Sequence, residues 1–253
     1  MNLTPILGIG LLACVPPAQA DEPSATPYRP TISNPAELSA PGWLEVEFGA
    51  ARAKGGQNQW QNNLPYTLKY AFSPDFGILL GGDLHASQTD WSGQETSGRG
   101  DNTLLFKHRF GVDERNAFGL EWGAKLPSAA AGVGSGQADY IVNGIYSVDI
   151  GETRIDTNLG ATRIGLEQVG LGRDQYSWAT AVSREVVPRW TLAGELSGTA
   201  RRGMTPTAQF LAAASYAVSN RLVLDGGAAA GLNRATPDWT VFAGLTWLVG
   251  KIH

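Results

Sequence analysis

The chain is poor in the residues that build covalent and metal chemistry. It has one cysteine, Cys14, in 253 residues. Cys14 lies in a leader that we expect to be removed, so the mature chain would have no disulfide, thiolate metal site or cysteine nucleophile. The three histidines are far apart, so no metal site is expected. No catalytic motif stands out, and the chain is not predicted to be an enzyme.

Two further features are missing. The formal net charge is −4, so the chain lacks the basic surface that nucleic-acid binding requires. After the leader no apolar run reaches the roughly 18 residues of a membrane-spanning helix. No nucleotide-binding motif is found either, so neither a cofactor nor an energy source is predicted.

The first 20 residues have the composition of a signal peptide. They form a short apolar stretch that ends in Ala18-Gln19-Ala20, which fits the small-residue cleavage pattern. Leu11-Leu12-Ala13-Cys14 also resembles a lipoprotein cleavage site, which remains the alternative. The sequence therefore predicts export, with cleavage after Ala20.

Residues 21–42 carry five prolines. Proline has no N–H to donate and is disfavoured inside a sheet, so this range is predicted to be irregular rather than a β-strand. We expect a Pro-rich periplasmic N-terminal segment. A segment folded back into the mouth of the following domain is the other location considered.

Residues 207–232 show the pattern that the rest of the chain repeats. Apolar residues alternate along two arms that meet at the polar turn Ser219-Asn220-Arg221. Each arm has about 11 residues, roughly the length of a tilted strand that crosses a bilayer. This range is therefore predicted to be a transmembrane β-hairpin.

The alternation recurs from residue 43 to the end of the chain. It predicts about twelve strands, in the ranges 43–54, 62–72, 76–87, 101–110, 117–127, 137–149, 152–162, 175–183, 190–200, the two arms of 207–232, and 239–249. Short turns alternate with longer Gly-rich loops, which is typical of outer-membrane barrels. The predicted fold is all-β: an antiparallel, outer-membrane-type transmembrane β-barrel over 43–253.

A secreted β-sandwich is the alternative fold, because its strands also alternate. In a sandwich the inward side chains would be apolar. Here one face of most strands carries charges, and the apolar face would have no second sheet to cover it. The pattern therefore favours a barrel whose apolar side meets lipid.

The charged side chains on the inward face are the candidate functional residues. They could form a salt-bridge network that fills a narrow barrel, or they could line a channel that selects solutes by charge. The strands before residue 157 carry most of them, whereas 207–232 is nearly neutral. The candidates are Glu45, Glu47, Lys69, Asp83, His85, Lys107, Arg109, Glu121, Lys125, Asp139, Arg154 and Asp156, with Glu195 on the same face.

One pair could in principle carry hydrolytic chemistry. His85 and Ser87 are two residues apart on one strand, so they share a face and could act as base and nucleophile. Outer-membrane lipid A deacylases use such a pair on the lipid side of a smaller barrel. Here the pair is expected to face inward, and no third group that would orient the histidine can be identified.

The chain also resembles a known family on two sets of residues. One is the stretch from Arg29-Pro30 through Asn34-Pro35 to Pro41-Gly42-Trp43-Leu44-Glu45-Val46-Glu47, and the other is the repeated strand–Ser–turn unit in 70–76, 180–186 and 216–222. These are similar to the "MetA-pathway of phenol degradation" proteins, outer-membrane transporters. The resemblance implies a barrel that passes small compounds, with aromatic ones among the candidates.

The predicted function is a passive outer-membrane channel or transporter for small solutes. Its expected partners are the lipid of the cell outer membrane and the solute. Two alternatives remain open: a lipid-modifying hydrolase that uses His85 and Ser87, and a structural barrel that acts through its loops.

Overall fold

The structure is a computed structural model that describes residues 22–56 and 59–252. The expected signal peptide, the cleavage site after Ala20 and the alternative site at Cys14 lie outside the described residues. No helix in the described part of the chain is long and apolar enough to cross a membrane.

The described chain is built from β-strands. They are β1 (Trp43–Gly55), β2 (Gln59–Ala71), β3 (Phe76–Thr89), β4 (Glu95–Gly98), β5 (Asn102–Gly111), β6 (Asn116–Leu126), β7 (Asp139–Ile150), β8 (Thr153–Arg163), β9 (Asp174–Val187), β10 (Trp190–Arg201), β11 (Thr207–Ser219), β12 (Leu222–Gly231) and β13 (Trp239–Lys251). Each of the twelve expected strands is present.

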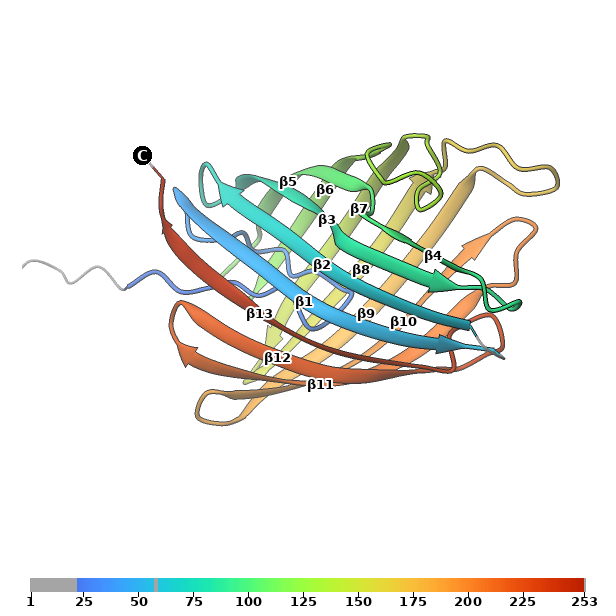
Figure 1. The fold of residues 1–253 in the computed structure, drawn as a ribbon. Helices are drawn as coiled ribbons and strands as arrows, with labels where there is room; N and C mark the ends of the chain where they lie inside the picture. Colours follow the sequence, from blue (N-terminus) through green and yellow to red (C-terminus); the bar gives the residue numbers. More distant parts are fainter. Residues whose placement is uncertain (1–21, 57–58, 253) are drawn as a thin grey trace, which may run out of the picture.

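All of the strands except β4 form one closed antiparallel barrel (Figure 1). Each pairs with its neighbours in sequence, and β1 pairs with β13 to join the first strand to the last. A pairing of β2 with β3 completes the ring. The predicted outer-membrane-type barrel is confirmed, and the alternative sandwich is wrong.

The side chains are distributed inside out relative to a soluble protein. Lys69, Lys107 and Glu45 have no exposed surface, whereas Phe110 and Trp190 on the other face are 49% and 44% exposed. A polar interior and an apolar exterior are the arrangement that lipid around the barrel would stabilise. The charged residues at alternate positions of the strands therefore correctly favoured a barrel over a sandwich.

The two ends of the barrel differ. The short turns lie at the same end as the C-terminus and the start of β1, and the longer loops lie at the opposite end (Figure 1). Aromatic pairs mark the outer face near both ends, with Trp190 and Tyr216 at the short-turn end and Trp60 and Trp239 at the long-loop end. In outer-membrane barrels the short turns face the periplasm.

Strand β4 was not predicted, because residues 88–100 were expected to form a loop. On one side β3 pairs with β5 only as far as Gly82, so its last residues would present a free edge there. Residues 95–98 pair with 86–89 and cover that edge. Covering an exposed edge in this way limits pairing with other chains.

Strands β2 and β3 contain the main irregularity of the wall. The pairing of Leu64 with His85 and of Pro65 with Asp83 leaves Leu84 as an extra residue, a β-bulge. On its other side β2 pairs with β1 over residues 59–63 and 66–70, and Leu64 and Pro65 between them have no partner in β1. Proline has no N–H, so Pro65 cannot continue that ladder.

Candidate functional site in the barrel lumen

The N-terminal segment, residues 22–42, lies inside the barrel. It passes the short-turn end, where the Ala25 N–H donates to Asn220 O at 2.8 Å, and it returns to that end at Pro41, which bridges to Ala71. In between, Tyr28 and Ala36 are buried. Of the two locations considered for this segment, periplasm or barrel interior, the structure has the interior (Figure 1).

The first part of the segment is held by charges of β1 and β2. Glu45 accepts a hydrogen bond from the Thr26 N–H at 2.8 Å, and Glu47 accepts one from the Tyr28 N–H at 2.7 Å. Lys69 donates to the Thr26 carbonyl at 2.6 Å and forms ion pairs with both carboxylates at 2.5 and 2.7 Å. These charges therefore satisfy the backbone of an irregular segment in a buried place.

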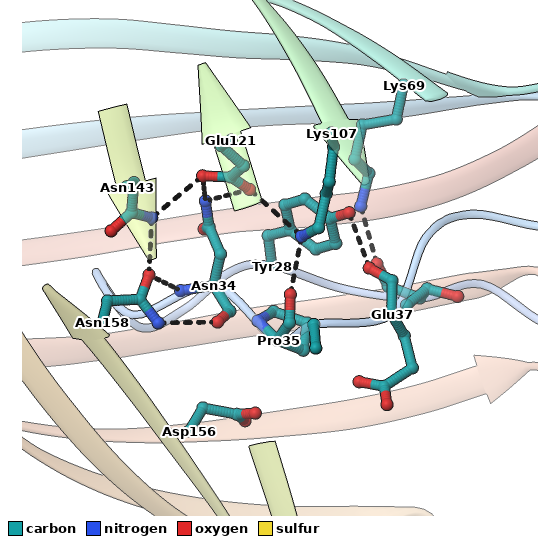
Figure 2. A network of polar contacts seen from close by, with 12 residues as sticks. Tyr28, Asn34, Pro35, Glu37, Lys69, Lys107, Glu121, Asn143, Asp156 and Asn158 are labelled. Atoms are coloured by element: carbon teal, nitrogen blue, oxygen red, sulfur yellow. Dashed lines mark hydrogen bonds and ion pairs between the residues drawn. The ribbon is translucent and has the colours of Figure 1, made fainter. Parts of the chain in front are cut away.

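Tyr28 lies at the centre of the site. The ammonium groups of Lys69 and Lys107 lie 3.9 and 4.0 Å from its ring centroid, and its hydroxyl donates to the Glu37 carbonyl at 2.8 Å. Figure 2 shows the ring beside both lysines. Two desolvated cations on one aromatic ring bind it more strongly than exposed ones would.

The middle of the segment contacts β5, β6 and β8. The Asn34 amide donates to both oxygens of Glu121 at 3.1 Å, and the Asn34 backbone exchanges two hydrogen bonds with the Asn158 amide (Figure 2). Lys107 donates to the Pro35 carbonyl at 2.6 Å and pairs with Glu121 at 3.1 Å. The same charges thus bind the segment and each other.

The end of the segment contacts β7 and β8. The Ala36 N–H donates to the Ser147 hydroxyl at 2.8 Å, and this hydroxyl donates to Asp156 at 2.5 Å. Arg154 forms ion pairs with Glu37, with Asp156 at 3.0 Å and with Asp149 at 3.2 Å. Of the three carboxylates that pair with Arg154, Glu37 is the one that the segment supplies.

The segment also reaches the opposite wall, where β10 and β12 each supply one carboxylate. Glu195 accepts hydrogen bonds from the N–H groups of Ile32 and Ser33 at 2.8 and 2.7 Å. Arg29 forms an ion pair with Asp225 at 2.9 Å. A Cβ on Gly49 or Gly244 would lie within 2.7 Å of Arg29 side-chain atoms, so these paired glycines of β1 and β13 leave room for it.

We expect Asp225→Asn to loosen the segment without unfolding the barrel. The Arg29 side chain is 18% exposed and would keep partial hydration, so the expected loss is about 1 kcal/mol. Faster protease cleavage in 22–40 of the folded protein would show the effect. Asp174→Asn, which removes an exposed partner of Arg163, is the control and should leave cleavage unchanged. Equal cleavage rates for the two variants would contradict the role of Asp225.

Beyond the segment the lumen is hollow. A cavity of about 340 Å³ lies against β6 to β11 and includes Ile32, Asn143 and Ser197. A second of about 300 Å³ lies against β1, β2, β3 and β5. A third of about 460 Å³ lies near the long loops and includes Asp83 and Asp90. The hydroxyl of Ser92 donates to Asp90 and lowers the pKa of that carboxyl.

The structure divides the predicted lumen residues into groups. Seven bond directly to the segment: Glu45, Glu47, Lys69, Lys107, Glu121, Arg154 and Glu195. Asp156 is linked to it only through Ser147 and Arg154. Lys125 lies nearer the long loops and pairs with Asp139 at 2.9 Å and with Asp101 at 3.2 Å. Asp83 accepts from Asn63 at 3.1 Å, and Arg109 pairs with Asp75 at the short-turn rim.

His85 is the exception, because it faces outward. The bulge at Leu84 shifts the alternation by one residue, so His85 pairs with the outward Leu64 and is exposed. The expectation that His85 lies in the lumen is therefore wrong. Ser87 accepts a hydrogen bond from the Asn62 amide at 3.1 Å. Within the described chain no hydrogen bond joins His85 to Ser87.

The segment itself supplies partners for the lumen charges, and these were not predicted from the sequence. Tyr28, Arg29 and Asn34 bind the lumen charges, yet they lie in a Pro-rich stretch with no periodicity. One signal was available: most of the inward charges lie at similar depth on adjacent strands. A row of buried charges at one depth requires a polar partner in the lumen.

No family model and no curated protein matches the chain. Solved structures do resemble it. An outer membrane channel from Pseudomonas putida F1 has a TM-score of 0.69 at 14% identity and covers 85% of this chain and 98% of its own. The NanC porin has 0.59 at 8%, with 81% and 100% covered. The CymD monoaromatic hydrocarbon channel has 0.53 at 9%, with 85% and 90% covered. At these identities the likeness establishes the fold.

Proposed function

We propose that the chain is a passive outer-membrane channel for small solutes. The observation that carries the proposal is a closed barrel with a hollow, polar lumen, in which the N-terminal segment fills the short-turn half. Similar barrels include an outer membrane channel and a porin. The outer-membrane location rests on the same likeness and on the apolar outer face.

Solute would enter from the long-loop end and reach the cavities beside Ser197 and Asp83. We assign the seven charges that contact the segment to holding it, because their polar atoms are already bonded to it. Lys125 and Asp139, near the long loops, pair with each other rather than with the segment, so we assign them to the solute's path instead. Complete passage requires a path past the segment, or its displacement.

The resemblance to the phenol-degradation family supports aromatic compounds as one class of solute. A structure with a similar fold is named as a monoaromatic hydrocarbon channel. The 340 Å³ cavity lies within the range of small-molecule pockets and combines Ile32 and Ile141 with polar groups. An aromatic compound with one polar substituent matches this combination of apolar and polar lining residues.

Planar-bilayer recordings and solute uptake by proteoliposomes test the channel. The mature chain should give a small, steady ion conductance, and it should admit small solutes faster than protein-free liposomes do. Uptake of phenol and glycerol, compared with a trisaccharide, would measure the size limit. The proposal fails if neither the mature chain nor a chain without residues 22–40 conducts or takes up solute.

The hydrolase alternative has weaker support. The outward position of His85 brings it to the lipid side, but the Ser87 hydroxyl is bonded to Asn62 rather than to His85. A nucleophile needs its base within hydrogen-bond reach. The cavities also argue against a purely structural barrel, whose lumen would be packed throughout.

A further inference from the structure

A group of cationic and aromatic residues lies on the outer face at the long-loop end of β1, β2 and β13. The Arg52 guanidinium lies 4.3 Å from the Trp60 ring centroid, and the Lys54 ammonium lies 5.8 Å from it. Trp60 packs edge-on against Trp239 at 5.7 Å. Arg52 and Lys54 alternate with inward residues, so both lie on the side that also carries Phe48.

These two cations lack carboxylate partners. Within the described residues neither Arg52 nor Lys54 forms a salt bridge, whereas the inward lysines Lys69, Lys107 and Lys125 all do. A positive pair on the outer face of a barrel is costly in the apolar band and is tolerated at its edge. The pair therefore favours an anion supplied from outside the chain.

The position along the strand agrees with the edge of a membrane. A strand rises about 3.3 Å per residue, and a tilt near 45° reduces the climb to about 2.3 Å. Arg52 and Lys54 would then lie about 19 and 23 Å above Leu44, the first outward apolar residue of β1. The apolar band of such barrels is about 25 Å tall, so both backbone positions lie within about 6 Å of its upper edge, and the long Arg52 and Lys54 side chains can extend from there to the headgroups.

An apolar groove of about 440 Å³ adjoins this pair. Its lining includes Ala50, Leu64, Val241 and Ala243, together with Arg52. The groove lies where the ladder between β1 and β2 is interrupted at Pro65. The small side chains of Ala50 and Ala243 form part of its floor. An acyl chain fits an apolar groove that opens toward a cationic rim.

We propose that this surface binds a phosphate-bearing lipid of the outer leaflet. Arg52 and Lys54 hold the phosphate, Trp60 and Trp239 lie at the polar–apolar boundary, and the groove below takes an acyl chain. Guanidinium and ammonium groups form charge-assisted hydrogen bonds with phosphate oxygens. The proposal rests on the outer-membrane location proposed above, but it does not require the lumen to conduct.

Native mass spectrometry of the mature chain in a nonionic detergent tests the site, with diphosphoryl lipid A as probe. Arg52→Gln/Lys54→Gln should lower its apparent affinity about tenfold, because two charge-assisted contacts are lost. Arg115→Gln/Arg202→Gln removes the same charge elsewhere and should bind like the unmodified chain. Heat-modifiable migration on a denaturing gel verifies that each variant is folded.

A dephosphorylated form of the same lipid separates phosphate recognition from acyl binding. It should bind the unmodified chain about as weakly as diphosphoryl lipid A binds the double variant. Equal binding of the two lipids, or equal loss in the control variant, would overturn the proposal. Unchanged conductance in Arg52→Gln/Lys54→Gln is expected, so failure here leaves the channel proposal standing.

Discussion

A chain that lacks residues 22–40 is expected to conduct ions at least about tenfold better than the mature chain. The segment fills the short-turn half of the lumen, and between Thr26 and Glu37 it is held mainly by side chains of the wall. Removal leaves the barrel ladders complete, because Pro41 and Gly42 still connect to Ala71. Because water enters the opened lumen, the wall charges are hydrated rather than buried without partners, and the barrel should remain folded.

The widened pore should also select cations. The anchors exposed by the deletion include more carboxylates than cations: Glu45, Glu47, Glu121, Glu195 and Asp225 against Lys69, Lys107 and Arg154. Reversal potentials in a salt gradient measure this preference. Deletion of residues 22–24 alone is the matched control and should change little. An unaltered conductance in the longer deletion would mean that the segment does not limit passage.

Lys107→Met is expected to be the most destabilising single substitution in the lumen, at about 3–5 kcal/mol. The lysine is fully buried, donates to Pro35, pairs with Glu121 and contacts the Tyr28 ring. Its loss leaves Glu121 buried without its cation. Part of this cost can be relieved by release of the segment, so unfolding in urea and protease cleavage in 22–40 should both be measured.

Lys125→Met is the control for this experiment. Its side chain is 22% exposed and pairs with Asp101 and Asp139 near the long loops, so a loss of up to about 1 kcal/mol is expected. Adding Glu121→Leu to Lys107→Met should recover part of the stability, because the unpaired charge is removed. Comparable urea midpoints for Lys107→Met and Lys125→Met would contradict the assignment of Lys107 to the anchoring network.

The strands could be predicted from the sequence because lipid and a polar lumen impose opposite demands on successive residues. Period-two alternation located β11 and β12 on either side of Asn220-Arg221 and gave the correct inward face for Glu45 and Lys107. The prediction failed at Leu84. A bulge inserts one residue without changing composition, so alternation alone cannot reveal which side His85 faces.

The position of the N-terminal segment was beyond the reach of periodicity for a different reason. Its conformation is irregular, and it is set by contacts with many strands rather than by its own residues. Asn34, for example, is fixed by Glu121 and Asn158, which are far away in sequence. Proline content predicted correctly that the range is not a strand, and it could give no information on those partners.

The distribution of the segment's anchors has a consequence for the order of assembly. Arg29 contacts Asp225, 196 residues later in the chain, and Ile32 contacts Glu195, 163 residues later. The first residues exported are therefore bound by side chains that arrive near the end of synthesis. Docking of the segment therefore cannot be complete until β12 has joined the sheet. Its contacts with Glu45 and Glu47, 19 residues away, can form much earlier, so the segment can begin to dock on the first strand and finish on one of the last.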